Sequence, residues 1–428
     1  SPLLPSHPSP FIPISRSSLD RAMARNDREL EDLAWYKTGV FLEKWKILEL
    51  LDEGGFGKVY RVQDTSASPP LFAALKIEST NMEGGSAIKL ERAALERIHK
   101  NTRKEHVPQL YRSSKRGNIC YMIVTLLGDN LKKMKERYYP NGYPLRLWVK
   151  VAVQSLFAIK TVHDAGFVHR DVKAANFVFG HPGEAKRARI IHIIDFGLAR
   201  QYVVEDPKKK NQLRPRPARP KTDFRGTWSF ASPSMHDYVE LGRKDDVWSW
   251  LFMLMDLYAT LPWANLDSLE AIGKMKQAMR DEDLVIKMPP ELLFVPRHLR
   301  KLDVYNRPDY RAIYDCLHKI FTRCRASWYE SYPWENRDMA SKNLAAMSAV
   351  SGESYLDPGP FFQSDPIKIN VGPSKYMPAD DFLMRPSMAR SGMATVPHEP
   401  PPSGGSAEKM LGSAEILPLS ISKENFAP

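Results

Sequence analysis

The chain has 428 residues, of which 43% are hydrophobic and 26% are charged. These values are ordinary for a soluble globular protein, and the length predicts two or three domains, or one bilobal domain with tails. The three cysteines, Cys120, Cys316 and Cys324, are odd in number and widely spaced, which argues against a disulfide framework or a cysteine-based zinc site. They indicate a reducing cytosolic or nuclear setting.

The basic charge of the chain is concentrated in its first 330 residues. The whole chain has a formal net charge of +12, whereas residues 331–428 hold eight Lys and Arg against eleven Asp and Glu, a net charge of −3. Residues 1–330 therefore carry +15. This excess is consistent with an anionic partner, such as an acidic or phosphorylated protein, a nucleotide or a nucleic acid, or with surface charge that only keeps the protein soluble.

Composition separates a central body from its two ends. Residues 1–20 are rich in Pro and Ser, which predicts a disordered arm, and residues 21–44 are interpreted as an N-terminal extension. Residues 331–428 are predicted to form a flexible C-terminal tail. The proline-broken start does not resemble a signal peptide. The apolar run 247–263 contains Asp256 and is too short to span a bilayer, so we expect a buried helix and no membrane partner.

The first half of the body is predicted to be rich in strands. Residues 45–64 alternate apolar and polar side chains on both sides of a glycine turn, as in a hairpin, and residues 71–79 form the next strand. Residues 86–100 have apolar side chains at helical spacing, with Ser86 in the N-cap position. Residues 118–127 are predicted to form a buried strand.

The second half of the body is predicted to be mostly helical. Residues 146–166 repeat apolar side chains at helical spacing and stop at Gly166, a good helix terminator. Further helices are expected near residues 245–258, 267–279 and 309–322. A small half rich in strands followed by a larger helical half leaves a cleft between them, which is a common place for a ligand.

The segment DEGGFGKVY (52–60) is a candidate phosphate-binding loop. Its glycines let the backbone bend tightly and present N–H groups to phosphate oxygens, although glycines between strands are more often simple turns. The following strand contains Lys76, whose ammonium would be costly in apolar surroundings without a carboxylate partner. Glu91, on the inward face of the next helix, is the natural partner. The alternative is a surface lysine on an edge strand.

The segment HRDVKAANF (169–177) places several polar and charged groups in one short stretch. Asp171 would accept a proton from an attacking hydroxyl group, and Lys173 would neutralise a phosphate during its transfer. Asn176 would offer its amide oxygen to a divalent cation. The pattern matches a catalytic-loop signature too closely for a coincidental loop to be the better interpretation.

A second acidic motif follows a strongly apolar strand. The segment IIHIIDFGLAR (190–200) runs directly into Asp195, Phe196 and Gly197. The tripeptide Asp-Phe-Gly is usually only a turn, but its position 24 residues after Asp171 makes it a strong signal. Asp195 would hold Mg²⁺ that bridges nucleotide phosphates, because hard cations prefer oxygen ligands.

In this order, these motifs resemble the eukaryotic protein kinases over residues 45–325. The resemblance implies a bilobal α+β fold, with a small N-lobe (45–127) that is rich in strands and has one main helix, and a larger helical C-lobe (128–330). It implies transfer of the γ-phosphate of ATP to protein hydroxyl groups with Mg²⁺. Its catalytic residues would be Asp171, Lys173, Asn176 and Asp195, of which Asn176 and Asp195 bind the metal. The residues expected to bind ATP are Gly54, Gly55, Phe56, Gly57, Val59, Ala74, Lys76, Glu91, Val124, Thr125 and Leu127.

Residues 224–263, with FRGTWSFAS, ELGRKDDVWS and LPW, resemble the casein kinase I superfamily. Together with the helix IKLERAALERI (88–98), they bring the chain closest to its tau-tubulin kinase branch. The resemblance implies a monomeric, Ser/Thr-directed enzyme that is active without phosphorylation of its activation segment. It also implies that Thr227 lies beside the catalytic loop and that Asp246 anchors this loop.

The chain departs from the family pattern at three positions. Asp52 stands where the family has another glycine, and its carboxylate would repel phosphate unless it points to solvent. Ser229 replaces an arginine that receives a phosphate or an acidic group of the substrate. Arg307 is present, although the glutamate that it pairs with in many kinases is absent.

The segment DPKKKNQLRPRPARPK (206–221) places seven Lys and Arg in the expected activation segment. Basic side chains beside a substrate groove would favour acidic or phosphorylated sequences and would offset the change at Ser229. A flexible, solvated loop is an equally good interpretation.

Three functions are compatible with the sequence. An active Ser/Thr protein kinase with protein substrates is favoured, because Lys76, Glu91, Asp171, Asn176 and Asp195 are all present. A pseudokinase or scaffold that binds protein partners is the alternative raised by Asp52. A nucleic-acid-binding protein would explain the basic body, but the chain has no recognisable reading module.

Overall fold

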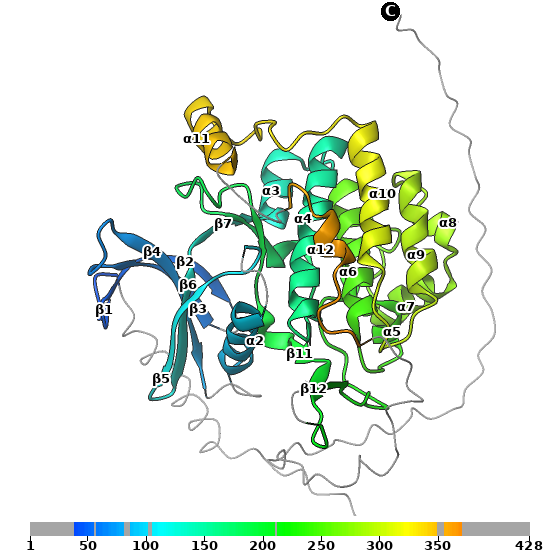
Figure 1. Ribbon diagram of the computed structural model, residues 1–428, viewed down its shortest axis with the longest axis horizontal. Helices are drawn as coiled ribbons and strands as arrows, with labels where there is room; N and C mark the ends of the chain where they lie inside the picture. The colour runs from blue at the N-terminus through cyan, green and yellow to red at the C-terminus, as the bar shows by residue number, and fades with distance from the viewer. Residues whose placement is uncertain are drawn as a thin grey trace, which may run out of the picture. The chain divides into compact units, whose positions relative to one another are not determined.

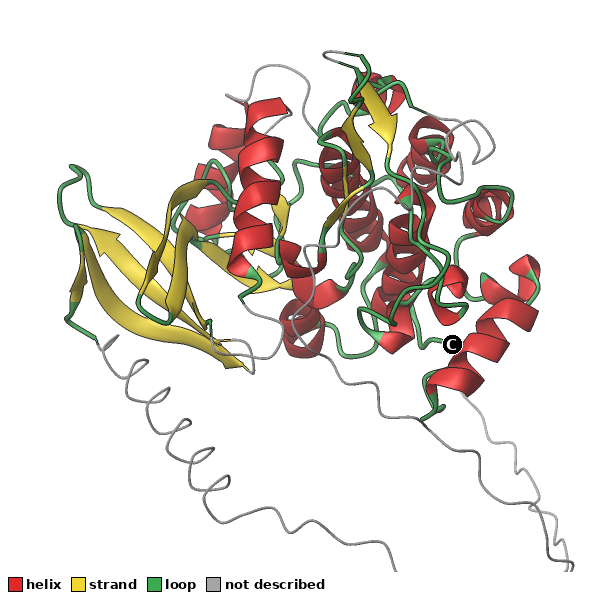
Figure 2. Ribbon diagram, turned by 90° about the horizontal axis from the view of Figure 1, so that it is seen from below, coloured by secondary structure: helices red, strands yellow, loops and turns green. Residues whose placement is uncertain are grey.

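The computed structural model describes residues 38–54, 57–80, 86–101, 105–209, 212–348 and 355–369. All of them belong to one compact unit, residues 1–377. Figure 1 shows a curled sheet beside a larger helical body, and Figure 2 shows the same separation of strands and helices from below. This arrangement confirms the predicted bilobal α+β fold.

The N-lobe is built on a six-stranded antiparallel sheet in the order β1-β2-β3-β4-β6-β5. The strands are β1 (Phe41–Leu42), β2 (Trp45–Gly54), β3 (Gly57–Asp64), β4 (Leu71–Ser79), β5 (Leu110–Arg116) and β6 (Ile119–Thr125). The predicted hairpin 45–64 is the pair β2 and β3. Alternate apolar side chains of these strands form one buried cluster, which includes Ile47, Val62, Leu75, Ile77 and Ile123.

Helix α2 (Ile88–Asn101) packs against this lobe with the face that its sequence predicts. Ile88, Glu91, Leu95 and Ile98 are all at most 5% exposed. The Ile88 N–H donates to the Ser86 hydroxyl at 3.2 Å, so Ser86 caps the helix as expected. The helix thus carries one buried charged side chain, Glu91, on an otherwise apolar face.

The C-lobe is mainly helical, and its core contains α4 and α6. Its helices are α3 (Leu131–Tyr138), α4 (Leu145–Asp164), α5 (Pro233–His236), α6 (Arg243–Tyr258), α7 (Leu269–Ala278), α8 (Asp281–Leu284), α9 (Phe294–Leu299), α10 (Tyr310–Arg323), α11 (Arg337–Ser348) and α12 (Gly359–Gln363). Gly166 follows α4 with φ near +89°, a conformation that favours glycine and ends the helix where predicted. None of the described helices is long and apolar enough to cross a bilayer.

Short strands and 3₁₀ turns connect the helices at the cleft. The strands are β7 (Leu127–Asn130), β8 (Phe167–Val168), β9 (Phe177–Gly180), β10 (Ile191–Ile193), β11 (Arg200–Gln201), β12 (Val203–Glu205) and β13 (Leu213–Pro215). The 3₁₀ turns are η1 (Ala174–Asn176), η2 (Phe196–Leu198), η3 (Trp228–Phe230) and η4 (Pro290–Leu293). β9 is the central strand of a three-stranded sheet with β10 and β7.

Part of the segment expected to be a flexible tail from residue 331 is folded onto the C-lobe. Figure 1 shows α12 in orange beside α4 and α10. Phe362 is completely buried, and its ring stacks on Tyr314 with centroids 5.0 Å apart, while Phe361 stacks on Phe157 at 3.9 Å. Apolar burial of these rings overrides the polar composition of the surrounding segment. Residues 370–428 lie outside the described part of the chain.

The same segment supplies acceptors to Arg307, whose usual partner is absent. Arg307 Nη2 donates to the Ser364 carbonyl oxygen at 2.7 Å and to the Phe362 carbonyl oxygen at 3.3 Å. Its guanidinium also lies 3.8 Å from the carboxylate of Asp365. The C-terminal segment therefore takes the place of the missing glutamate.

We predict that Phe362→Ala destabilises the protein by about 3–5 kcal/mol, because a fully buried aromatic ring is removed and a cavity remains. Urea unfolding followed by circular dichroism measures this change. The control Ile286→Ala, at a side chain that is 75% exposed, should change the free energy of unfolding by less than about 0.5 kcal/mol. A cost below about 1 kcal/mol at Phe362 would show that α12 is not part of the cooperative unit.

Candidate active site

Two short antiparallel strands bring the predicted metal ligands together. β9 pairs with β10 so that Phe177 lies opposite Ile193. Next to this pair, the Ile194 N–H donates to the Asn176 carbonyl oxygen at 2.9 Å. Asn176 and Asp195 therefore lie at adjacent ends of paired strands, as a shared metal site requires.

Asp171 lies at the centre of the catalytic loop and is only 8% exposed. Its Oδ2 is 2.7 Å from Lys173 Nζ and accepts a hydrogen bond from Asn176 Nδ2 at 3.2 Å. Its Oδ1 accepts a hydrogen bond from the Thr227 hydroxyl at 3.2 Å. The structure thus joins three residues of the catalytic loop to the activation segment through one carboxylate.

The amide of Asn176 is oriented by its neighbour. Asn176 Nδ2 donates to the Asp171 carbonyl oxygen at 2.8 Å. Because the amide nitrogen is used in this way, the amide oxygen remains as the acceptor for a cation. This orientation fits the role expected from the sequence.

Asp246, on α6, holds the catalytic loop by its backbone. Its Oδ2 accepts from the His169 N–H at 2.6 Å and its Oδ1 from the Arg170 N–H at 2.8 Å, and His163 Nε2 lies 2.8 Å from Oδ2. Burial alone would raise the pKa of Asp246, but the hydrogen bond and charge of His163 outweigh it and lower the pKa. The anchoring role expected for Asp246 agrees with these contacts.

Asp195 adopts a left-handed backbone conformation, with φ near +67°. The following residue, Phe196, is completely buried and packs edge-on against His169 with ring centroids 5.2 Å apart. Burial works to raise the pKa of Asp195, but the positive charges of Lys76, His169 and Lys173 lower it. The carboxylate is therefore ionised at neutral pH, as a metal ligand must be.

Lys76, on β4, forms the ion pair predicted from the sequence. Its Nζ is 2.8 Å from Glu91 Oε2 on α2 and 3.7 Å from Asp195 Oδ1. Burial would lower the pKa of Lys76, but Glu91, Asp195 and Glu78 together raise it above its ordinary value. The ammonium thus stays charged at the point where the two lobes meet.

The other nucleotide-binding candidates surround this lysine. Strand register places Val59 opposite Lys76 and Ala74 opposite Val124, so these four side chains share one face of the sheet. Gly57 has φ near +149°, and a Cβ there would overlap the carbonyl oxygen of Ile77. This position therefore requires glycine.

The remaining candidates lie on both sides of the glycine turn and at the hinge, the segment 125–127 that connects the two lobes. Gly54 ends β2 and Leu127 begins β7, whereas Gly55 and Phe56 lie outside the described residues. Thr125 is buried, and its hydroxyl accepts hydrogen bonds from the Gln109 N–H and from Arg187. Its side chain therefore belongs to the packing of the hinge.

Three acidic residues lie near the site. Asp52, which the sequence analysis named, is exposed to solvent, and its carboxylate accepts a hydrogen bond from the Glu53 N–H at 3.0 Å. Glu78 and Glu240, to which the sequence analysis gave no role, are buried, with exposed fractions of 2% and 8%. A signal for Glu78 exists, because it lies two residues after Lys76 in a strand and so faces the same side. Glu240 is the first residue of the motif ELGRKDDVWS quoted above, but the sequence analysis assigned it no role.

Comparison with known proteins agrees with this geometry. A model of the protein kinase domain matches residues 45–320. The chain belongs to the protein kinase family. It is related to casein kinase I-like kinases, through the relatives described next.

Three relatives come from Caenorhabditis elegans. A putative serine/threonine-protein kinase is 35% identical over 293 residues, which cover 68% of this chain and 82% of the relative. A protein named as an inactive tau-tubulin kinase is 32% identical over 300 residues, covering 69% and 100%. A putative casein kinase I is 26% identical over 325 residues, covering 74% and 91%.

The residues of this kinase domain fit ATP and Mg²⁺, which the family implies. Asp195 and Asn176 offer a carboxylate and an amide oxygen, which hard cations prefer, and Lys76 offers an ammonium to phosphate oxygens. When bound, the metal neutralises negative charge on the phosphates.

Buried histidines fix the strand that leads into Asp195. His106 Nδ1 donates to the Ile191 carbonyl oxygen at 2.7 Å, and the Ile193 N–H donates to the His106 carbonyl oxygen at 2.9 Å. Both His106 and His192 are at most 1% exposed. Burial lowers the pKa of His106 to about 4 and, together with the charges of His106 and Arg187, lowers that of His192 to about 3.

These histidines predict acid destabilisation of the kinase domain. Below pH 6.5 these histidines become protonated in the unfolded chain but stay neutral in the folded chain. The free energy of unfolding therefore falls as the pH drops from 6.5 towards 4. For His106 the loss is about 3 kcal/mol over this range. Urea unfolding of wild type and His106→Gln between pH 7 and 4.5 measures the prediction. The free energy of unfolding should fall less steeply with decreasing pH in the variant than in wild type. Equal slopes would contradict the prediction, and the exposed His318→Gln serves as control.

Proposed function

We propose that this chain is a catalytically active Ser/Thr protein kinase. The observation that carries the proposal is the 2.8 Å ion pair between Lys76 and Glu91, formed beside Asp195. This pair must be in place for phosphoryl transfer in protein kinases. The alternative, a pseudokinase that binds partners, is supported by the relative named as inactive, whereas Asp52, which first raised it, is exposed to solvent.

The reaction assigned to the site is an in-line transfer. The oxygen of a substrate Ser or Thr attacks the γ-phosphorus of ATP, its proton passes to Asp171, and ADP leaves with the bridging oxygen. Lys173, 2.7 Å from Asp171, is close enough to stabilise the transferred phosphoryl group. Thr227 orients Asp171 from the activation segment.

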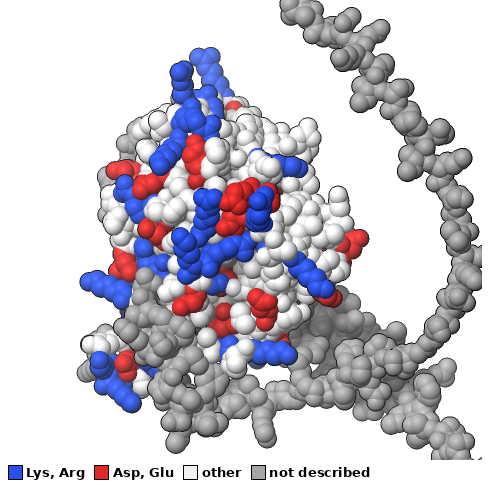
Figure 3. Space-filling model, turned by 90° about the vertical axis from the view of Figure 1, so that its right-hand side faces the viewer, with Lys and Arg blue, Asp and Glu red and all other residues white. Residues whose placement is uncertain are grey.

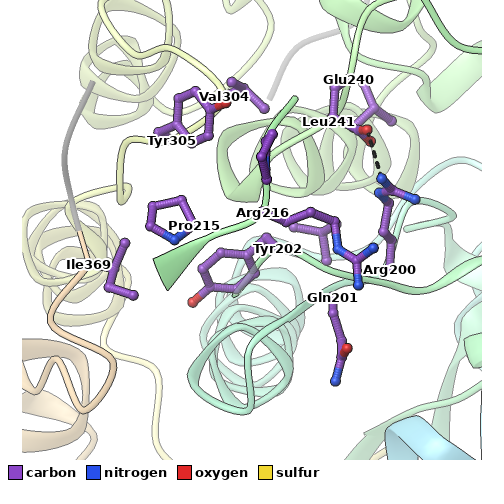
Figure 4. A pocket seen from close by; sticks show the side chains of 12 residues that line it. Arg200, Gln201, Tyr202, Pro215, Arg216, Glu240, Leu241, Val304, Tyr305 and Ile369 are labelled. Atoms are coloured by element: carbon purple, nitrogen blue, oxygen red, sulfur yellow. Dashed lines mark ion pairs between the residues drawn. The ribbon is translucent and has the colours of Figure 1, made fainter. Parts of the chain in front are cut away.

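We also propose a preference for acidic or phosphorylated substrates. Its support is an arginine cluster around one carboxylate, formed by Arg170, Arg200, Arg216, Arg219 and Arg225 near Glu240. Arg219 donates to both carboxylate oxygens of Glu240, and Arg200 Nη2 lies 3.3 Å from Oε2. Figure 4 shows Arg200, Arg216 and Glu240 around one pocket of the activation segment.

The arginine cluster has more positive charge than Glu240 neutralises. Burial lowers the pKa of Arg170 to about 10. The charge of Glu240 works to raise this pKa, but the charges of three arginines lower it further: Arg200, Arg225 and Arg219. Arg170 directly precedes Asp171, so an anion held here would lie near the transferred group. The cluster would therefore compensate for Ser229, which replaces the family's arginine.

The charge elsewhere gives less support to a nucleic-acid partner. Figure 3 shows basic and acidic side chains intermixed on one face. Ion pairs join α8 to the segment of α9 and the residue after it, and join η4 to α10: Arg297–Glu282, Arg300–Asp281 and Arg323–Glu291. Such alternation does not form the continuous basic surface that a phosphate backbone needs.

We propose a monomer that acts in the cytosol or the nucleus.

The decisive experiment is transfer of radiolabelled phosphate from ATP to casein in the presence of Mg²⁺. Asp171→Asn should lower kcat at least about 100-fold, because the proton acceptor is lost, and should leave the melting temperature nearly unchanged. The exposed Asp267→Asn is the matched control and should behave as wild type. If wild type and Asp171→Asn are equally inert and both bind a protein partner, the scaffold interpretation replaces the kinase.

The substrate preference has a separate test. Arg225→Ala removes a cation of the arginine cluster that is paired only loosely, at 3.6 Å, with the exposed Asp223. We expect KM for a phosphorylated peptide to rise about tenfold, with KM for its unphosphorylated, neutral counterpart unchanged. Arg297→Ala, on α9, is the control. An equal rise for both peptides would contradict recognition of charge at this cluster.

A further inference from the structure

Lys76 interacts with a second buried carboxylate that none of the kinase motifs includes. Glu78 lies two residues further along β4, and its Oε1 is 3.2 Å from Lys76 Nζ. Its side chain is 3% exposed. Because side chains two apart in a strand point to the same face, both residues face α2. Lys76 is thus held by Glu91 from the helix and by Glu78 from its own strand.

The other oxygen of Glu78 is bound to the start of α2. Glu78 Oε2 accepts from the Ser86 hydroxyl at 2.9 Å and from the N–H of Ile88, the first residue of α2, at 3.2 Å. A carboxylate at this end of a helix satisfies a backbone donor that has no partner within the helix, and it is stabilised by the helix dipole. Glu78 therefore shares the capping of α2 with Ser86, but from a neighbouring strand.

These contacts attach α2 to β4 at two points. One is the pair of Glu91 with Lys76, and the other is the contact of Ile88 with Glu78, one helical turn away. A single ion pair would allow the helix to swing about it, whereas two attachments on one face resist rotation. The Asp-Phe-Gly turn packs on the same end, where a Cβ on Gly197 would lie 2.9 Å from the Cβ of Ala87.

Both oxygens of the buried Glu78 carboxylate are used in this arrangement, one by α2 and one by Lys76. Within the described part of the chain, Glu78 Oε1 has no hydrogen-bond partner, so the charge of Lys76 is what compensates its burial. A buried carboxylate without a compensating cation is strongly unfavourable. If α2 moved away, Glu78 Oε2 would lose the Ile88 N–H, whereas Lys76 on the same strand would still face Oε1.

We propose that Glu78 is a positioning residue that holds α2 and Lys76 in the arrangement needed for ATP. The proposal rests on the proposed kinase function. The attachment lies entirely within the N-lobe. The contacts of Glu78 in the described part of the chain are with Lys76, Ser86 and Ile88, none of which is expected to accept the substrate proton.

Three variants separate the two contacts of Glu78. Glu78→Gln keeps an acceptor for Ser86 and Ile88 and removes the charge facing Lys76. Ser86→Ala weakens the cap and keeps that charge, and Glu78→Ala removes both. Each should lower kcat/KM for ATP, by about tenfold for Glu78→Ala, with KM for casein unchanged. Glu96→Gln is the control, because Glu96 is exposed on the same helix and pairs with Arg92 at 3.6 Å.

Hydrogen exchange of the unphosphorylated chain gives a readout that does not depend on activity. Amides in the first turns of α2 should exchange faster in Glu78→Ala than in wild type, while those of α4 and α6 stay unchanged. Glu78→Gln and Ser86→Ala provide the same comparison if Glu78→Ala unfolds. Wild-type exchange in α2 together with wild-type kcat/KM for ATP would overturn the proposal. If wild type transfers no phosphate, the proposed kinase function fails, and the exchange measurement still decides the role of Glu78.

Discussion

The catalytic geometry depends above all on the buried carboxylate of Asp246. This residue is 2% exposed and lies on α6, within the core of the C-lobe. Its carboxylate accepts hydrogen bonds from the backbone N–H groups of His169 and Arg170. Asp246 therefore fixes the backbone of the loop directly before Asp171. Arg170 has φ near +67°, a conformation that is costly for a residue other than glycine and that persists only when its surroundings impose it. Packing of the core helices thus determines where the proton acceptor lies.

The N-lobe positions its functional groups in a different way. Its sheet supplies one face on which Val59, Ala74 and Lys76 are arranged by register. The position of α2 against that face also depends on charge, since Lys76 is surrounded by Glu91, Glu78 and Asp195. Three carboxylates around one ammonium leave an excess of negative charge, which is compatible with cationic ligands at this point of the cleft. Ion pairs therefore add to apolar packing in placing α2 in the small lobe.

The C-terminal segment shows that the kinase body extends beyond the region matched by the family model. Lys160, Arg243 and Arg307 come from different parts of the C-lobe, and the first two are at most 3% exposed. Lys160 Nζ donates to the Ser364 hydroxyl at 3.1 Å, and Arg243 Nη2 donates to the Ile369 carbonyl oxygen at 2.7 Å. Arg307 uses carbonyl oxygens of the same segment. Buried cations need acceptors, so this segment completes the lobe.

The sequence by itself determined the order and type of the elements and the short motifs that carry chemistry. Periodicity placed β2, β3, β4, α2 and α4, because alternation in a strand and the helical repeat are local properties. Spacing within HRDVKAANF put Asp171, Lys173 and Asn176 on one loop, and all three meet there. The pairing of Lys76 with Glu91 could be predicted because both are charged residues on inward faces.

Only the tertiary structure decided which distant groups complete these motifs. The link from Glu78 to Ile88, the acceptors of Arg307 at residues 362–365 and the arginines around Glu240 join segments that no local pattern connects. The tail predicted from composition differs from the folded segment that contains α12, because two buried aromatic rings outweigh the polar residues around them. Local patterns record which face of an element is apolar, whereas the partner of a buried charge depends on how the whole chain packs.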